Sequence, residues 1–420
     1  MSFTQTRRGA LLGLVAATAI FTALPALADD VTLTFWGAYG NGGNSTQQDA
    51  LNNTLIPAFE AAHPGVKVKY VDIPYDSLLQ KLTTSAAGGE LPDLVRADLG
   101  WVPQFAKLGV LVPLSDTMSD FKTFADATYP GSLSTNLYKG KYYGLPLDTN
   151  TRVLVTSQAA LDKAGLSAPP KTFDELKAMA DKLKGTDMQV FADGGLGGWN
   201  ILPWIWSGGG NITDPDLTKA TGYLDGPDSV AAVQMLVDLY KAGQIPNLII
   251  GNSGATSTSD GLPSGNYATI LDGPWMAGIW KDQYPDFTPI YAPVPAGKGG
   301  SISVVGGEDI VLTAASKNQD AALDFIRFTQ SEQFQVEMAK TGQMTVIPAY
   351  ADQQTAIAPY YATYAEQLKT AKSRLAISSS AKVDAILNTE LTPAFKGDVS
   401  VQDALTKAAG EIDGLLAAEK

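Results

Sequence analysis

Residues 91–101 read Leu91-Pro92-Asp93-Leu94-Val95-Arg96-Ala97-Asp98-Leu99-Gly100-Trp101. The apolar part, Leu91 to Val95, predicts a short buried strand, and Asp98 and Trp101 follow in the loop before a helix. Ligands of open α/β sheets bind at the carboxyl ends of strands. A carboxylate beside an indole suits a sugar, because the acid accepts hydroxyl hydrogen bonds and the ring covers the C–H face. Taken alone, the stretch is equally typical of a connection with a buried Trp.

Strands and helices alternate before this stretch. Residues 31–36 and 66–71 alternate apolar and polar residues as strands do, and residues 50–62 and 75–87 have the apolar spacing of helices. His63-Pro64-Gly65 ends the first helix, because Pro cannot continue it and Gly allows the reversal. This β-α-β-α-β order predicts a largely parallel sheet with right-handed crossovers.

Two later stretches predict strands that cross between lobes. Residues 145–155 are apolar but are split by Pro146 and by the polar run 148–151, which fits a strand whose polar residues face a cleft. Residues 304–312 have the character of a second crossing strand. A chain of 420 residues exceeds one ordinary core, so two lobes are expected. Helices are expected to close the chain, at 321–328, 332–340, 359–371, 383–394 and 401–416.

Composition excludes several classes of site. The chain has no Cys and one His, His63, which excludes disulfides, thiolate metal sites and most His-based catalysis. We therefore expect no metal and no cofactor. The net charge is -13, and removing residues 1–28, with Arg7 and Arg8 and no acid, leaves 28 basic against 43 acidic residues, or -15. Nucleic acid and anionic lipid are unfavourable partners for such a chain.

The first 28 residues are typical of a signal peptide. Arg7-Arg8 precede an apolar run over residues 10–24, and Ala26-Leu27-Ala28 is a small-x-small cleavage site. We expect cleavage before Asp29 and a mature protein in the periplasm, without stable membrane insertion and, having no Cys, without a lipid anchor. A retained membrane anchor is the alternative, and both the general and the twin-arginine export routes remain open.

Tryptophans are the strongest functional signal. Six of them lie at strand ends or in Gly-rich loops, beside polar residues such as Asn200, which is the composition of a carbohydrate site. Trp206 is the exception, since it lies two residues after Trp204 in a predicted helix and is expected in the core. The glycines at 40, 42 and 43 lack the spacing of a phosphate-binding loop. Ser253 and Ser264 lack the G-x-S-x-G pattern of nucleophilic hydrolases. The tryptophans are Trp36, Trp101, Trp199, Trp204, Trp206 and Trp275.

Seven short segments together resemble one family. They are FWG at 35–37, PAFEAAHPGVKV at 57–68, GGELPD at 88–93, FAKLGVLVPL at 105–114, YGLP at 143–146, KTFDEL at 171–176 and ILDGPW at 270–275. The chain is similar to the extracellular solute-binding proteins of family 1, the sugar receptors of ABC importers, and more distantly to maltose-binding protein. The resemblance covers essentially the whole chain after residue 28.

The resemblance implies an α/β, type II-like periplasmic-binding-protein fold with crossing strands and a helical C-terminal segment. It implies that residues 29–149 and 308–342 form the first lobe and residues 150–307 and 343–420 the second. It also implies that Trp275 stacks on a sugar ring. The expected ligand-binding residues are Tyr39, Gln47, Asp98, Trp101, Asp148, Asn150, Trp199, Trp204, Asp272, Trp275, Gly306, Glu308 and Arg374. Thr156-Ser157 and Ala381-Lys382 depart from the family pattern, so one stacking platform is expected to be missing.

The resulting expectation is a periplasmic receptor that binds a di- or oligosaccharide and delivers it to the permease and ATPase of an ABC importer. We expect a monomer that catalyses no reaction. A periplasmic glycoside hydrolase is an alternative, because Asp98, Asp148, Asp272 and Glu308 could face one cleft. A receptor for a non-sugar solute such as a polyol phosphate is another, although the expected cleft has almost no arginine apart from Arg374. The identity of the sugar, its length and its linkage remain open.

Overall fold

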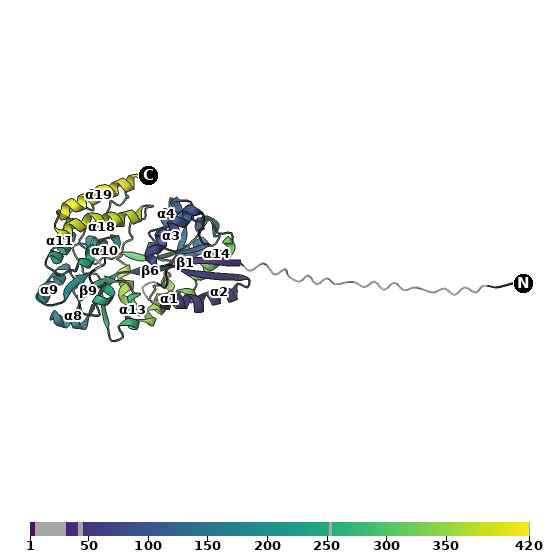
Figure 1. Ribbon diagram of the computed structural model, residues 1–420, viewed down its shortest axis with the longest axis horizontal. Coiled ribbons are helices and arrows are strands. Elements are labelled where there is room, and N and C mark those ends of the chain that lie inside the picture. Colours follow the sequence, from purple (N-terminus) through teal and green to yellow (C-terminus); the bar gives the residue numbers. More distant parts are fainter. Residues whose placement is uncertain (5–30, 41–44, 252–253, 420) are drawn as a thin grey trace.

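The computed structural model describes residues 1–4, 31–40, 45–251 and 254–419. The expected signal peptide from residue 5 onward, Gly42 and Gly43 of the first loop, and Ser253 lie outside the described residues. The described chain folds into two α/β lobes that lie side by side along the long axis of the molecule (Figure 1). This arrangement confirms the predicted fold class. No helix among the described residues is long and apolar enough to cross a bilayer.

The first lobe is built on a five-stranded sheet with the order β2-β1-β3-β11-β6. The three N-terminal strands are parallel, as predicted, whereas β11 is antiparallel to both of its neighbours. A small hairpin of β4 (Leu137–Tyr138) and β5 (Lys141–Tyr142) lies apart from it. The sheet strands are β1 (Val31–Gly37), β2 (Val66–Asp72), β3 (Leu94–Asp98), β6 (Gly144–Thr151) and β11 (Val305–Leu312).

Helices cover both faces of this sheet. Leu33 and Phe35 of β1 pack with Phe325 on one face, and Val95 of β3 packs with Leu82 on the other. Burying each such side chain contributes about 1.5–3 kcal/mol. The helices are α1 (Ser45–Ala50), the π-helical η2 (Leu51–Leu55), α2 (Ile56–Ala62), α3 (Tyr75–Gly88), α4 (Val102–Lys107), α5 (Leu114–Thr117), α6 (Phe121–Ala127), α7 (Pro130–Ser134), α14 (Gln319–Thr329) and α15 (Glu332–Ala339).

The chain passes between the lobes as extended strand, which confirms the predicted crossing at residues 145–155. β6 pairs with β11 in the first sheet, and β7 (Val153–Ser157) pairs with β9 and β10 in the second. Only Arg152 separates the two strands. β11 carries the chain back, since Val304 bridges to Lys372 and Val305 then pairs with Thr151.

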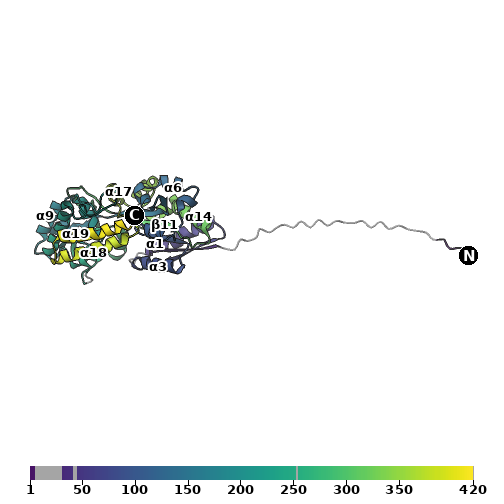
Figure 2. The same ribbon diagram turned by 90° about the horizontal axis from the view of Figure 1, so that it is seen from above.

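The second lobe has a four-stranded sheet with the order β10-β7-β9-β8, in which only β8 and β9 are parallel. Figure 2 shows its long helices α18 and α19 side by side, in the lobe that lies away from α14. The strands are β7, β8 (Gln189–Ala192), β9 (Tyr267–Asp272) and β10 (Pro289–Ala292). The helices are α8 (Gln158–Lys163), α9 (Phe173–Leu183), α10 (Gly198–Ser207), α11 (Pro227–Lys241), η3 (Asn247–Ile250), α12 (Thr258–Gly261), α13 (Met276–Gln283), α17 (Tyr361–Leu368), α18 (Ser380–Lys396) and α19 (Val401–Ala417).

Successive side chains of β7 point to opposite faces of the sheet and pack into two different cores of this lobe. Leu154 packs into the cluster under α9, α10 and α19, whereas Val153 and Val155 pack on the opposite face with Trp280 and Tyr364. The remaining short helices, η4 (Pro348–Tyr350) and α16 (Ala351–Ile357), pack against α15. The second lobe therefore holds the crossing strand from both sides.

Two local predictions, a helix cap and a core tryptophan, are confirmed. The hydroxyl of Thr172 accepts a hydrogen bond from the Glu175 amide at 3.1 Å, which is the predicted helix cap. Trp206 is 2% exposed in the core, as expected.

The boundaries of the stretch at 91–101 were predicted wrongly. The strand spans Leu94–Asp98, so it begins three residues later and Asp98 is its last residue instead of a loop residue. Pro92 has no amide hydrogen for a sheet ladder, and the Asp93 carboxylate accepts a hydrogen bond from the Thr34 amide at 2.8 Å. The antiparallel neighbour β11 extends the ladder as far as the pair Asp98 and Glu308.

Candidate functional site

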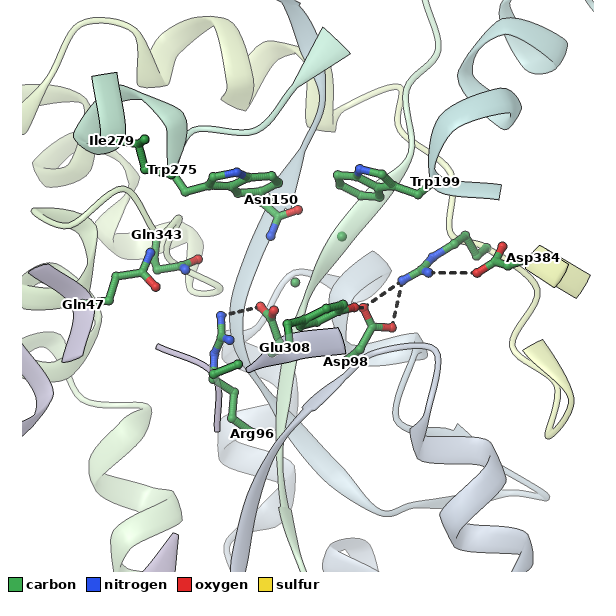
Figure 3. A pocket seen from close by; sticks show the side chains of 15 residues that line it. Gln47, Arg96, Asp98, Asn150, Trp199, Trp275, Ile279, Glu308, Gln343 and Asp384 are labelled. Atoms are coloured by element: carbon green, nitrogen blue, oxygen red, sulfur yellow. Dashed lines mark hydrogen bonds and ion pairs between the residues drawn. The ribbon is translucent and has the colours of Figure 1, made fainter. Parts of the chain in front are cut away.

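A cavity of about 450 Å³ lies where the two lobes meet. Its size falls within the range of small-molecule sites in proteins. Figure 3 shows two indoles along one side of it, and carboxylates and a guanidinium across from them. The cavity is lined by Ala38, Gln47, Tyr75, Arg96, Asp98, Asn150, Trp199, Trp275, Ile279, Gly306, Gly307, Glu308, Gln343, Arg374 and Asp384.

The aromatic side of the cavity belongs to the second lobe. Trp199 lies in the first turn of α10, and Trp275 follows β9 and precedes α13. Their ring centroids are 6.2 Å apart and their planes differ by 30°. The two indoles therefore form one nearly continuous apolar surface that faces the first lobe (Figure 3).

Two glycines make room for these indoles. A Cβ atom on Gly306 would collide with the ring of Trp199 and with the side chain of Asn150. A Cβ atom on Gly273 would collide with the ring of Trp275. Any larger residue at either position would displace an indole, so the absence of a side chain is part of the site.

The polar side of the cavity centres on Arg96. Its Nη2 atom lies 2.8 Å from Glu308 Oε2 and 3.3 Å from Asp148 Oδ2. The Arg96 guanidinium also lies over the ring of Tyr39, 4.3 Å from the centroid. Arg96, Glu308 and Asp148 come from the neighbouring strands β3, β11 and β6, and Tyr39 lies in the turn after β1, so the sheet of the first lobe holds all four together.

Asp98 connects the two lobes. Its carboxylate accepts hydrogen bonds from the Tyr75 hydroxyl at 2.6 Å, the Gly100 amide at 2.8 Å and Arg374 Nη2 at 2.8 Å. Arg374 belongs to the second lobe, where its neighbour Leu375 packs in the core. Arg374 also pairs with Asp384, at 3.5 Å. This chain of ion pairs spans the cleft at one end of the cavity (Figure 3).

Among the described residues that line the cavity, two uncharged side-chain acceptors have no hydrogen-bond partner. They are Asn150 Oδ1 and Gln343 Oε1, both buried. A buried acceptor without a donor costs about 1–3 kcal/mol. The Nε donors of Arg96 and Arg374 are also buried without a partner. A ligand with hydroxyl groups, which both donate and accept hydrogen bonds, would recover part of this cost.

Burial shifts the pKa of the charged groups that line the cavity. Burial raises the pKa of Glu308 well above its usual value, Arg96 opposes the rise, and Asp148 adds to it. Burial disfavours the charged form of Arg96, but Glu308 and Asp148 outweigh it and raise the pKa of the guanidinium. Arg96 therefore stays charged, and Glu308 holds its proton to a higher pH than an exposed Glu does.

Asp309 lies next to Glu308 but points away from the cavity. The register between β11 and β6 shifts by one residue between Glu308 and Asp309. The Asp309 carboxylate accepts hydrogen bonds from Asn136 Nδ2 at 2.7 Å and from the Thr135 hydroxyl at 3.1 Å. Burial, partly offset by these two hydrogen bonds, raises the pKa of Asp309 to about 8.

The structure brings together most of the residues that the sequence singled out. From both lobes and both crossing strands, it places at the cavity Gln47, Asp98, Asn150, Trp199, Trp275, Gly306, Glu308 and Arg374. Tyr39 and Asp148 lie one layer behind, in contact with Arg96.

Three expected residues lie elsewhere. Trp101 is 7% exposed and packs on Tyr75, with ring centroids 5.4 Å apart, so Tyr75 takes its place at the cavity. Trp204 is 1% exposed in the core between Phe173 and Phe191. It lies five residues after Trp199 in α10 and therefore on a different side of that helix. Asp272 is not at the cavity, and its carboxylate accepts a hydrogen bond from the Gly273 amide.

Sequence reasoning missed several lining residues. Arg96 follows the predicted strand of Leu91 to Val95, so the sequence assigns it no face. In the observed strand Leu94–Asp98 it lies two residues before Asp98 and therefore on the same face. Tyr75, Gln343 and Asp384 come from segments distant in sequence, and no local pattern distinguishes them. Among the described residues, no cluster of three or more His, Asp or Glu side chains is placed to hold a metal ion.

Comparisons with known proteins agree with this geometry. A family model described as bacterial extracellular solute-binding protein matches residues 42–336. A binding protein of Brucella abortus is 30% identical over 300 residues, covering 66% of this chain and 70% of the relative. The diacetylchitobiose-binding protein of Streptomyces coelicolor is 26% identical over 320 residues, covering 74% and 71%. An ABC transporter solute-binding protein from Thermotoga lettingae, solved with α-D-tagatose, superposes with a TM-score of 0.81 at 26% identity, covering 92% of this chain and all of that one.

Asp309 predicts a pH dependence of stability. Its pKa of about 8 in the folded chain lies above the value of about 4 in an unfolded chain, so only the folded chain holds the proton between these values. Stability should therefore fall as pH rises from about 4 to about 8, by up to about 1.4 kcal/mol per pH unit from this group, and level off above. Urea unfolding of the wild type and of Asp309→Asn at a series of pH values measures this slope, which should be shallower in the variant. The exposed Asp126→Asn is the control, and equal slopes in all three proteins would contradict the prediction.

Proposed function

The chain belongs to the bacterial extracellular solute-binding protein family, and we propose that it binds a neutral di- or oligosaccharide between its lobes and delivers it to an ABC importer. The observation that carries this proposal is the pairing of two indoles with a wall of hydrogen-bonding groups across one cavity. Sugar rings have apolar C–H faces and hydroxyl edges. The indoles match the faces, and the unpartnered acceptors of Asn150 and Gln343 match the hydroxyls.

The charges of the cavity favour a neutral ligand. Among the residues that line it, the two arginines are both engaged with carboxylates: Arg96 with Glu308, and Arg374 with Asp98. A phosphate group would need arginines that are free to form bidentate pairs. The alternative hypothesis of a receptor for a polyol phosphate, which the sequence left open, is therefore less favoured.

Two features favour a ligand of more than one ring. The indoles of Trp199 and Trp275 lie side by side in Figure 3, with ring centroids 6.2 Å apart, so each would be a platform for one of two neighbouring sugar rings. A relative from Streptomyces coelicolor is named for diacetylchitobiose, and one from Pyrococcus abyssi, 27% identical, for maltotriose. We propose Gln47, Asp98, Asn150, Glu308 and Arg374 as the polar contacts that complete the site.

The proposal includes the location and the partners of the protein. Residues 1–28 would direct export and be removed before Asp29, leaving a monomer in the periplasm. The permease of an ABC importer, driven by its ATPase, would read the closed state of the lobes. The lobes that move would be residues 29–149 with 308–342, and residues 150–307 with 343–420, because strands cross between them at β6–β7 and β11.

A glycoside hydrolase would need one cavity carboxyl as acid and another free as base or nucleophile. Asp98 is held by Arg374, Tyr75 and the Gly100 amide, and Glu308 is paired with Arg96. We therefore expect no cleavage when a bound oligosaccharide is incubated with the protein for days and the mixture is separated by chromatography. Product that forms with the wild type and is lost with Glu308→Gln would show the hydrolase instead.

The stacking role of Trp275 predicts a loss of affinity. Covering a sugar face with the indole removes on the order of 80–120 Å² of apolar surface from water, which contributes about 2–3 kcal/mol at about 25 cal/mol per Å². Trp275→Ala should therefore weaken the tightest-binding sugar of a mono-, di- and oligosaccharide panel about 30- to 150-fold in calorimetry. Trp275→Phe should retain part of the affinity, because a smaller ring still stacks.

Trp204→Phe is the matched control. Trp204 is also a tryptophan of the second lobe, but it lies in the core, so its substitution should lower the melting temperature and change affinity less than about threefold. If Trp275→Ala behaved like this control, losing stability but not affinity, Trp275 would be a packing residue and the stacking role would be wrong.

A further inference from the structure

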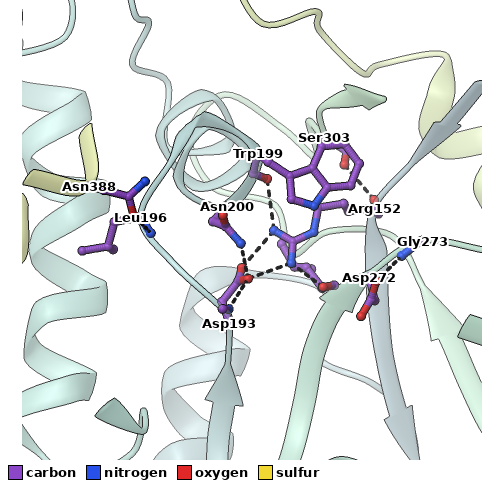
Figure 4. Close-up of polar contacts among 11 residues, drawn as sticks. Arg152, Asp193, Leu196, Trp199, Asn200, Asp272, Gly273, Ser303 and Asn388 are labelled. Atoms are coloured by element: carbon purple, nitrogen blue, oxygen red, sulfur yellow. Dashed lines mark hydrogen bonds and ion pairs between the residues drawn. The ribbon is translucent and has the colours of Figure 1, made fainter. Parts of the chain in front are cut away.

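Arg152 lies outside the cavity, at the point where the chain passes from one sheet to the other. It separates β6 from β7 and is 3% exposed. Its backbone carbonyl accepts a hydrogen bond from the Ser303 hydroxyl at 2.7 Å, on the segment that leads into β11. Arg152 therefore sits between both crossing strands (Figure 4).

The guanidinium of Arg152 holds the two segments that carry the indoles. It donates from Nη1 to the Trp199 carbonyl at 3.0 Å and from Nη2 to the Leu271 carbonyl. Leu271 is joined to Trp275 by only Asp272-Gly273-Pro274, in which the ring of Pro274 fixes a backbone angle. One planar group thus bonds to the main chain of both segments. The guanidinium carbon also lies 5.5 Å from the centre of the Trp199 ring.

Asp193 completes the arrangement. It accepts two parallel hydrogen bonds from Arg152, both of 2.9 Å. Asp193 also accepts from the Gly194 amide at 2.8 Å and from the side-chain amide of Asn200, next to Trp199. The pair therefore fixes the loop that leads into α10 as well as the end of β9 (Figure 4).

The energetics favour a positional role over a purely stabilising one. The side chains of Arg152 and Asp193 are 4% and 3% exposed, and the Nε atom of Arg152 has no partner. Buried ion pairs of this kind contribute little net stability compared with an apolar replacement, because both charges lose their hydration. What the planar fork supplies is a fixed geometry for several acceptors at once.

We propose that Arg152 is a positioning residue that sets the distance and tilt between the indoles of Trp199 and Trp275, and so selects ligands that cover both. The selection of ligands rests on the proposed sugar binding, whereas the positioning of the two indoles by Arg152 does not. A ligand of two rings depends on the relative position of both platforms, whereas a ligand of one ring needs only one of them.

A spectroscopic test needs no ligand. Two indoles 6.2 Å apart couple their electronic transitions, and the resulting circular dichroism couplet depends on their mutual orientation. The couplet is identified as the signal lost in both Trp199→Phe and Trp275→Phe. Arg152→Lys keeps the charge beside Asp193 but lacks the planar fork, so it should lose most of this couplet. An unchanged couplet in a folded Arg152→Lys protein would overturn the proposal.

Two further proteins make the result decisive. Arg327→Lys is the control, because Arg327 also makes two hydrogen bonds to one carboxylate, that of Asp120, but in the first lobe away from the indoles; it should keep the full couplet. If Arg152→Lys fails to fold, Arg152→Gln combined with Asp193→Asn removes both buried charges and takes its place. Retention of the couplet in that double variant would equally overturn the proposal.

Binding gives an independent measure. The two-ring probe is whichever of maltose, cellobiose, lactose and N,N′-diacetylchitobiose binds the wild type most tightly, and the one-ring probe is its monosaccharide. Arg152→Lys should weaken the disaccharide about tenfold or more and the monosaccharide less than about threefold. Equal losses for both probes would overturn the selection of two-ring ligands. If neither a disaccharide nor a longer oligosaccharide of the panel binds the wild type, the proposed function fails, while the couplet still decides the role of Arg152.

Discussion

The continuous extended passage from β6 through Arg152 to β7 is the constraint on which the structure depends. It forms the edge strand β6 of the first sheet and the inner strand β7 of the second, so both sheets depend on it. Because only Arg152 separates the two strands, the lobes lie next to each other, and the cavity is lined by residues of both. The first lobe then contributes hydrogen-bonding and charged groups such as Arg96, Asp98 and Glu308. The second lobe contributes the indoles, together with Arg374 and Asp384. A ligand that needs both kinds of contact is bound fully only when the lobes meet.

The charged side chains around the cavity are held in ion pairs. Arg96 and Arg374 are each paired with carboxylates, so the site has a fixed polar surface without a free cation among the lining residues. One of these pairs, Asp98 with Arg374, joins the lobes, and a second contact between them, Lys107 with Glu419 at 3.7 Å, is partly exposed to solvent. Exposed pairs contribute about 0–1 kcal/mol, so the Lys107–Glu419 contact adds little to the contact between the lobes. A ligand would add the contacts that make the closed state the stable one.

Sequence reasoning reached the architecture because the apolar periods and the polar interruption at 148–151 are local signals. It also indicated Trp199 and Trp275, which line the cavity, since a Gly-rich loop marks the first and a strand end the second. Glu308, which lies within β11, was expected only from the resemblance to the family. Sequence reasoning failed where tertiary packing decides which way a side chain points. Trp204 is in the same helix as Trp199, but a different side of that helix faces the core. Tyr75 lines the cavity in place of Trp101, because the Trp101 ring packs against the ring of Tyr75. The positions of Gln343 and Asp384 depend on the packing of segments far apart in the chain.

We propose that the two halves of the site belong to lobes that close on a sugar. Small-angle X-ray scattering of the wild type, with and without a saturating concentration of the tightest-binding sugar of the panel, measures this closure. The sugar should reduce the radius of gyration and the maximum dimension, because the ligand brings the indoles of the second lobe against the polar wall of the first. Superimposable scattering curves, at a sugar concentration that calorimetry shows to be saturating, would contradict it.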